Sequence, residues 1–72
     1  MIANRTALEL QGIAALGGSL EVDGSRYTAF ELQGIAVLLK PNAYLKVCNS
    51  GSKTTMEIQG IAAMKPGQVI FS

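Results

Sequence analysis

The residues best suited to chemistry in this chain belong to a motif that occurs three times. Each copy reads Glu-(Leu/Ile)-Gln-Gly-Ile-Ala, and the copies begin at Glu9, Glu31 and Glu57. A carboxylate and an amide therefore stand two positions apart in every copy. These side chains form a candidate repeated binding surface, which would take a symmetric partner or the same surface on another copy: Glu9, Gln11, Glu31, Gln33, Glu57 and Gln59.

The three motif glutamates also raise the question of acid–base catalysis. Glycoside hydrolysis uses two carboxyl groups in different environments, whereas three equivalent glutamates offer no such difference. The chain has no histidine and a single cysteine, Cys48, so neither a nucleophile with its base nor a zinc cluster is expected. We therefore expect a protein that is not an enzyme and that holds no cofactor or metal ion.

A structural role is the competing interpretation of the glutamate and the glutamine. Glutamine could satisfy backbone groups left unpaired at a bend, because buried backbone groups need partners. Glutamate could pair with the basic residue that opens each unit, which is Arg5, Arg26 or Lys53. The glycine, isoleucine and alanine that follow are identical in all three copies and are explained by a bend and its packing.

The element that carries each motif is predicted from its alternation of apolar and polar residues. Leu8 and Leu10 alternate with Glu9 and Gln11, and the other two copies follow the same order. Period two is typical of a half-buried strand. The apolar positions then change parity, which predicts a bulge or bend at the central glycines, Gly12, Gly34 and Gly60.

A second, shorter strand is predicted in each unit after a turn. The turns are Gly17-Gly18, Pro41-Asn42 and Pro66-Gly67, and the inward pairs of the strands are Leu20 and Val22, Leu45 and Val47, and Val69 and Phe71. Every connection is too short for a parallel crossover. We therefore expect an all-β fold in which three tandem β-hairpins form a six-stranded antiparallel meander, closed into a barrel or prism with approximate threefold symmetry. Residues 1–72 form a single domain, with units at 5–24, 26–51 and 53–72.

Two other folds are compatible with the sequence. A three-coil β-solenoid fits the unit length, but it would stack the three glutamates in a ladder about 4.8 Å apart, where like charges oppose one another. A helix from Ala7 to Leu16 would use good helix formers, but the central glycine and the flanking turn residues weigh against it.

The barrel would enclose eighteen apolar positions, grouped by their place in the unit. These are Leu8, Phe30 and Met56; Leu10, Leu32 and Ile58; Ile13, Ile35 and Ile61; Leu16, Leu39 and Met64; Leu20, Leu45 and Val69; and Val22, Val47 and Phe71. A chain of 72 residues is near the lower limit for an independent core. Since 49% of the residues are apolar and 15% are charged, we expect exposed apolar area and a homo-oligomer.

These expectations lead to a non-enzymatic structural or protein-interaction module that associates with itself. The alternative is a small carbohydrate- or ligand-binding module resembling a lectin in its repeated shallow sites, although the aromatic residues are few: Tyr27, Tyr44, Phe30 and Phe71. Nucleic acid is not an expected partner, because the net charge is only +1 and the basic residues form no block.

The sequence predicts no membrane segment, because the longest apolar stretch, Ile35 to Leu39, is far shorter than the roughly 20 residues that span a bilayer. The solitary Cys48 favours a reducing compartment, and we expect a cytoplasmic protein.

Overall fold

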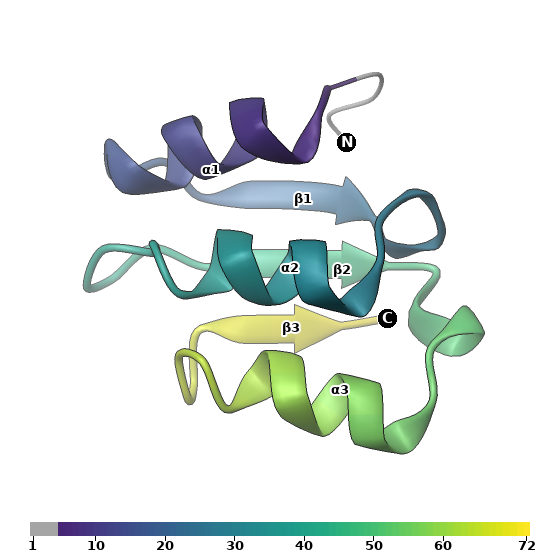
Figure 1. Ribbon diagram of the computed structural model, residues 1–72. Coiled ribbons are helices and arrows are strands. Elements are labelled where there is room, and N and C mark those ends of the chain that lie inside the picture. The colour runs from purple at the N-terminus through teal and green to yellow at the C-terminus, as the bar shows by residue number, and fades with distance from the viewer. Residues whose placement is uncertain (1–4) are drawn as a thin grey trace.

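Helices alternate with short strands along the chain. The computed structural model describes residues 5–72. In order, its elements are α1 (Ala7–Ala15), β1 (Leu20–Asp23), the 3-10 helix η1 (Gly24–Arg26), α2 (Ala29–Ala36), β2 (Leu45–Cys48), the 3-10 helix η2 (Ser50–Ser52), α3 (Thr55–Ala62) and β3 (Val69–Phe71). Figure 1 shows the three α-helices side by side in one layer, over one face of a sheet made by the strands. We call each α-helix with its following strand a unit, so that unit 1 is α1 and β1, unit 2 is α2 and β2, and unit 3 is α3 and β3.

The predicted all-β fold is wrong, because each motif copy lies in a helix. The helices begin with the same capping box, in which a threonine hydroxyl accepts a hydrogen bond from the N–H of the motif glutamate and that glutamate bonds back to the threonine N–H. The pairs are Thr6 and Glu9, Thr28 and Glu31, and Thr54 and Glu57. Capping satisfies backbone groups at the start of a helix and so fixes where it begins.

The apolar spacing that predicted a bulge is helical spacing. Leu10 and Ala14 are buried and Ile13 is half-buried, and positions separated by three and four residues share one face of a helix. Gly12 therefore lies within a regular helix, as Gly34 and Gly60 do. Leu8 points away from the core and is 77% exposed, so the alternation that predicted a strand does not mark an inward face.

The three short strands predicted after the turns are present, with the predicted residues facing the core. Their arrangement differs, because the sheet is open and parallel in the order β1-β2-β3. The register aligns Leu20 with Leu45 and Val69, and Val22 with Val47 and Phe71. A helix lies between successive strands and supplies the long crossover that parallel pairing needs. The antiparallel meander, the closed barrel and the β-solenoid are therefore all wrong.

The core lies between the helix layer and the sheet. Its buried members are Leu10, Ala14, Leu20, Val22, Tyr27, Leu32, Ile35, Ala36, Leu39, Ala43, Leu45, Val47 and Ile61. The Tyr27 hydroxyl donates a hydrogen bond of 2.7 Å to the carbonyl oxygen of Arg5, which ties the segment before α2 to the segment before α1.

Among residues 5–72, no helix has the length and hydropathy required to cross a bilayer.

Candidate functional site

The motif glutamates lie at the starts of the three neighbouring helices, where each is engaged by its own helix. Their Oε1 atoms accept hydrogen bonds of 2.9, 2.9 and 2.8 Å from the N–H groups of the capping threonines. The carboxylates of Glu9, Glu31 and Glu57 thus act as helix caps. This geometry accounts for glutamate at all three positions without a ligand.

Glu9 illustrates the electrostatics of such a cap. The hydrogen bond from the Thr6 backbone lowers the pKa of the Glu9 carboxyl most, followed by the bond from the Thr6 hydroxyl. The Arg5 guanidinium, 3.7 Å from the second carboxylate oxygen, acts in the same direction. All three contacts favour the ionised form, because they stabilise the negative charge at the helix start.

The motif glutamines connect the helices to one another. The side-chain nitrogen of Gln11 lies 2.8 Å from the point where a Cβ on Gly34 would stand, and that of Gln33 lies 2.7 Å from the same point on Gly60. Any larger residue would have to displace the amide. The structure therefore brings Gln11 and Gln33 each onto the glycine of the next unit, a relationship not predicted from the sequence.

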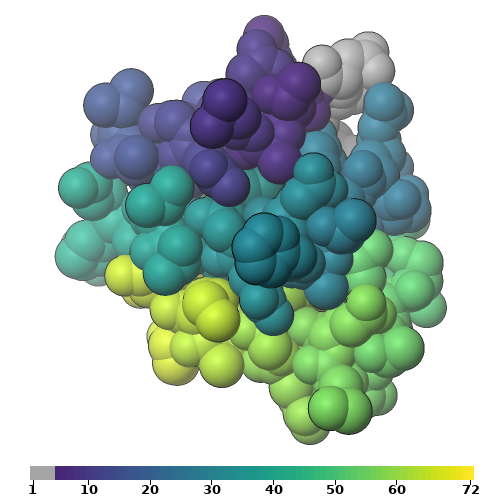
Figure 2. Space-filling view, viewed as in Figure 1, coloured from purple at the N-terminus to yellow at the C-terminus, as the bar shows by residue number. Residues whose placement is uncertain are grey.

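Among residues 5–72, this pattern leaves one glutamine and one glycine without a counterpart, at opposite ends of the stack. Gln59 belongs to α3, the last of the three described helices, and is exposed. Gly12 belongs to α1, and a Cβ placed on it would meet nothing within 4 Å. Figure 2 shows the units as successive bands of the surface, with unit 1 at the top and unit 3 at the bottom.

The end of the stack formed by unit 3 also exposes apolar core positions. In unit 1, four inward residues of the helix and strand are buried, although Ile13 is half-buried: Leu10, Ala14, Leu20 and Val22. Their counterparts in unit 3 are only half-buried: Ile58, Ala62, Val69 and Phe71. We call this surface, together with Gln59, the unit 3 end face. The sheet edge at this end is β3, and the opposite edge is β1.

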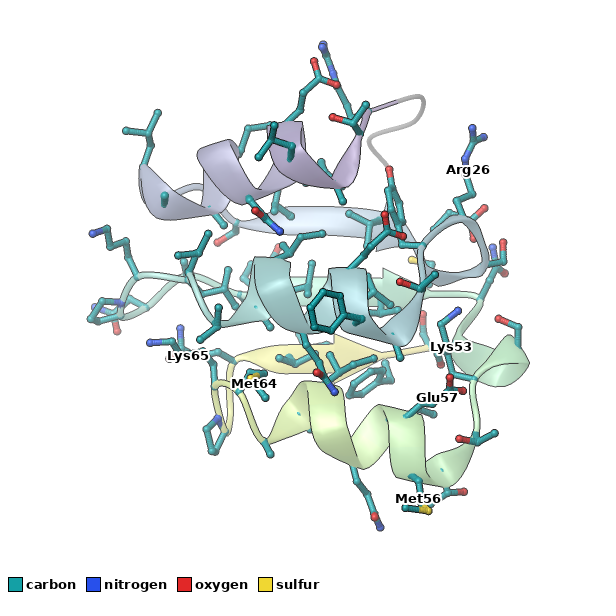
Figure 3. The ribbon with its side chains drawn as sticks, in the orientation of Figure 1. Arg26, Lys53, Met56, Glu57, Met64 and Lys65 are labelled. Carbon is teal, nitrogen blue, oxygen red and sulfur yellow. The ribbon has the colours of Figure 1, made fainter. Side chains whose placement is uncertain are left out.

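The outer surface of the helix layer carries a further set of exposed apolar side chains. Leu8, Phe30 and Met56 occupy the same position in the three helices and are 77%, 83% and 82% exposed. Figure 3 shows Met56 projecting from α3 on the side away from α2, beside the unit 3 end face. These three residues, and Leu16 at 91% exposure, were predicted to lie inside the barrel, and that prediction is wrong.

One open pocket lies beside the start of α1. It has a volume of about 450 Å³ and is lined by Arg5, Thr6, Ala7, Arg26, Tyr27 and Glu31. Its Glu31 carboxylate already caps α2, and the Tyr27 hydroxyl already binds a backbone carbonyl. Within the described part of the chain, no group of three His, Cys, Asp or Glu side chains is arranged to hold a metal ion.

The helices and strands form a two-layer α/β stack of three helix–strand units. No family model, curated protein or solved structure matches this chain.

Proposed function

We propose that this protein is a non-enzymatic structural module that associates with copies of itself. The observation that carries the proposal is the half-buried state of Ile58, Ala62, Val69 and Phe71 at the unit 3 end face. In stacked-unit proteins each unit covers its neighbour, and an outer face that no unit covers must be polar to remain in water. The outer side of unit 3 lacks such a face, so contact with another surface would lower its free energy.

The surface that covers these positions elsewhere in the chain supports a copy of the same protein as partner. Unit 2 covers the side of unit 1 that carries Leu10 and Leu20, and unit 3 does the same for unit 2. Unit 1 of another copy presents a surface equivalent to those by which units 2 and 3 cover their neighbours. The net charge of +1 gives little repulsion between copies.

A cytoplasmic setting is part of the proposal. Cys48 is a free, half-buried thiol in β2, and reducing compartments keep thiols in that form.

Sedimentation velocity over a range of concentrations tests the proposal. We expect the average mass to rise from the 7.6 kDa of one chain toward multiples of it as the concentration increases. A single 7.6 kDa species up to several hundred micromolar would contradict self-association. Repeating the measurement in high salt separates the apolar contact expected here, which salt does not weaken, from association driven by charge.

A further inference from the structure

We infer that copies of this protein associate head to tail, with the unit 3 end face of one copy against the unit 1 end of the next. This inference rests on the proposed self-association and names its geometry. In the contact, β3 of one copy pairs in parallel with β1 of the next, and Gln59 lies over Gly12. The contact between copies thus repeats the two contacts that exist between units within the chain.

The first support is the backbone pairing within the sheet. The N–H of Leu20 donates to the carbonyl of Tyr44 at 2.9 Å, and the N–H of Leu45 donates to the carbonyl of Gln68 at 2.8 Å. Each bond joins the first residue of a strand to the residue before the next strand. In a head-to-tail contact, the N–H of Val69 would donate to the carbonyl of Ser19 in the following copy. Exposed sheet edges are ready sites for such pairing.

The second support is the match between the two ends of the helix layer. Gly34 and Gly60 are each covered by a glutamine, whereas a Cβ on Gly12 would meet nothing within 4 Å. Gln59 is exposed, whereas Gln11 and Gln33 are half-buried against the next unit. The unfilled glycine and the exposed glutamine thus stand at opposite ends of one molecule, as head-to-tail stacking requires.

The third support is the apolar surface that the contact would cover. Ile58, Val69 and Phe71 are half-buried. Their equivalents Leu10, Leu20 and Val22 are buried in a unit that has a following neighbour. A following copy would supply that neighbour. Burial of apolar surface is the main favourable term in such contacts.

A twofold contact between two unit 3 end faces would bury the same apolar residues. It would pair β3 with its own copy in the antiparallel direction and would leave Gln59 without a glycine. The head-to-tail contact gives β3 a parallel partner strand and gives Gln59 a glycine to lie on. Because it joins two different surfaces, it produces a series of growing assemblies or a closed ring, whereas a twofold contact stops at a dimer.

Matched arginine variants test which surface makes the contact. Gln59 and Met56 are both exposed on α3. In units that have a following neighbour, the glutamines equivalent to Gln59 are half-buried, whereas Leu8 and Phe30, the equivalents of Met56, remain 77% and 83% exposed. We expect Gln59→Arg to raise the dissociation constant about tenfold or more, because the larger charged side chain would not fit over Gly12 of the next copy, and Met56→Arg to leave it within about threefold. Equal weakening by both variants would assign association to the outer helix surface and overturn the inference.

Gly12→Arg tests the opposite end of the molecule. The position is open in the monomer, so circular dichroism should show an intact fold, while the side chain would occupy the place assigned to Gln59 of another copy. We expect association to weaken about tenfold or more, and the exposed Ala15→Arg on the same helix to have little effect. If Gln59→Arg weakens association and Gly12→Arg does not, the contact is twofold and the inference is wrong, although self-association stands. If the unmodified chain remains monomeric, the proposed function itself fails.

Discussion

The side-chain nitrogen of Gln33 lies 2.7 Å from the point that a Cβ on Gly60 would occupy. Glycine in the middle of a helix normally lowers stability by roughly 0.5–1 kcal/mol relative to alanine. At Gly60 it allows the amide of the preceding unit to lie directly on the helix surface. The same relationship joins Gln11 to Gly34, so the glutamine and glycine of the motif act as a pair between adjacent units.

Alanine at the motif glycines should separate this contact from helix propensity. Gly12→Ala should stabilise the fold by about 0.5–1 kcal/mol, because nothing lies within 4 Å of the new methyl group. Gly34→Ala should give a smaller gain, because the Gln11 amide must move. Urea denaturation at low protein concentration measures both changes. An equal gain at the two positions would show that the Gln11 contact contributes nothing to stability.

The threonine caps should contribute measurably to stability. Thr54→Ala removes the hydroxyl that accepts from the Glu57 N–H at 3.2 Å and should lower the free energy of unfolding by about 1 kcal/mol. Its neighbour Thr55 is the first residue of α3 and provides a matched control. Thr55→Ala should be neutral or slightly stabilising, because alanine is the better helix former. Equal losses in thermal denaturation would refute the capping role.

Acid should weaken the fold through Asp23. Its Oδ1 accepts hydrogen bonds from the Ser25 hydroxyl, the Asn49 amide and the Ser25 N–H, and these bonds lower the pKa of the Asp23 carboxyl below its ordinary 3.8. A carboxyl with a lower pKa in the folded state stabilises the fold fully above the unfolded value, and that stabilisation is lost as the pH falls through the folded value.

Asp23→Asn should therefore reduce the fall in stability below about pH 4, while it keeps a good capping residue before η1. Glu9→Gln should act in the same direction below about pH 4.5, because the pKa of Glu9 is also lowered. Denaturation measured from pH 7 to pH 2.5 checks both variants. A pH profile that is unchanged in the double variant would contradict this assignment.

Equivalent core positions in units 2 and 3 should respond differently to truncation. Leu32 is fully buried, and Leu32→Ala should cost about 2–5 kcal/mol and leave little folded protein. Ile58 occupies the same helix position but is half-buried, so Ile58→Ala should cost clearly less in the monomer and should also weaken association. Calorimetry at low concentration, paired with sedimentation at high concentration, separates the two effects. Equal losses of monomer stability would mean that unit 3 is as well covered as unit 2.

The strands were predictable from the sequence because their signals are local. Leu20 and Val22 alternate with polar residues beyond a Gly-Gly turn, and the structure places both in the core. Strand direction was not predictable in this way, since it depends on what connects the strands. Once the preceding segment is a helix, the connection becomes a crossover, and the pairing becomes parallel.

The helix from Ala7 to Leu16, the less favoured alternative from the sequence, nearly matches α1 at Ala7–Ala15. The alternation, the central glycine and the flanking turn residues favoured a strand and outweighed a capping signal. Threonine followed three residues later by glutamate, ahead of an apolar run, marks a helix start, and it occurs at Thr6, Thr28 and Thr54. The exposed Leu8 completed an apparent strand pattern, although its side chain faces solvent. The contact between Gln11 and Gly34 has no local signal, because it depends on how two helices lie side by side.

Cross-linking between chains that carry different cysteines tests the head-to-tail contact most directly. On a Cys48→Ser background, one chain carries Gly12→Cys and another carries Gln59→Cys, and a short bis-maleimide is added to each chain alone and to their mixture. A single chain with Gln11→Cys and Gly34→Cys calibrates the reach of the reagent on the equivalent internal contact. We predict that cross-linked dimers form in the mixture and scarcely in either chain alone. Dimers of the Gln59→Cys chain alone, or no dimers while the internal control reacts, would contradict the head-to-tail contact.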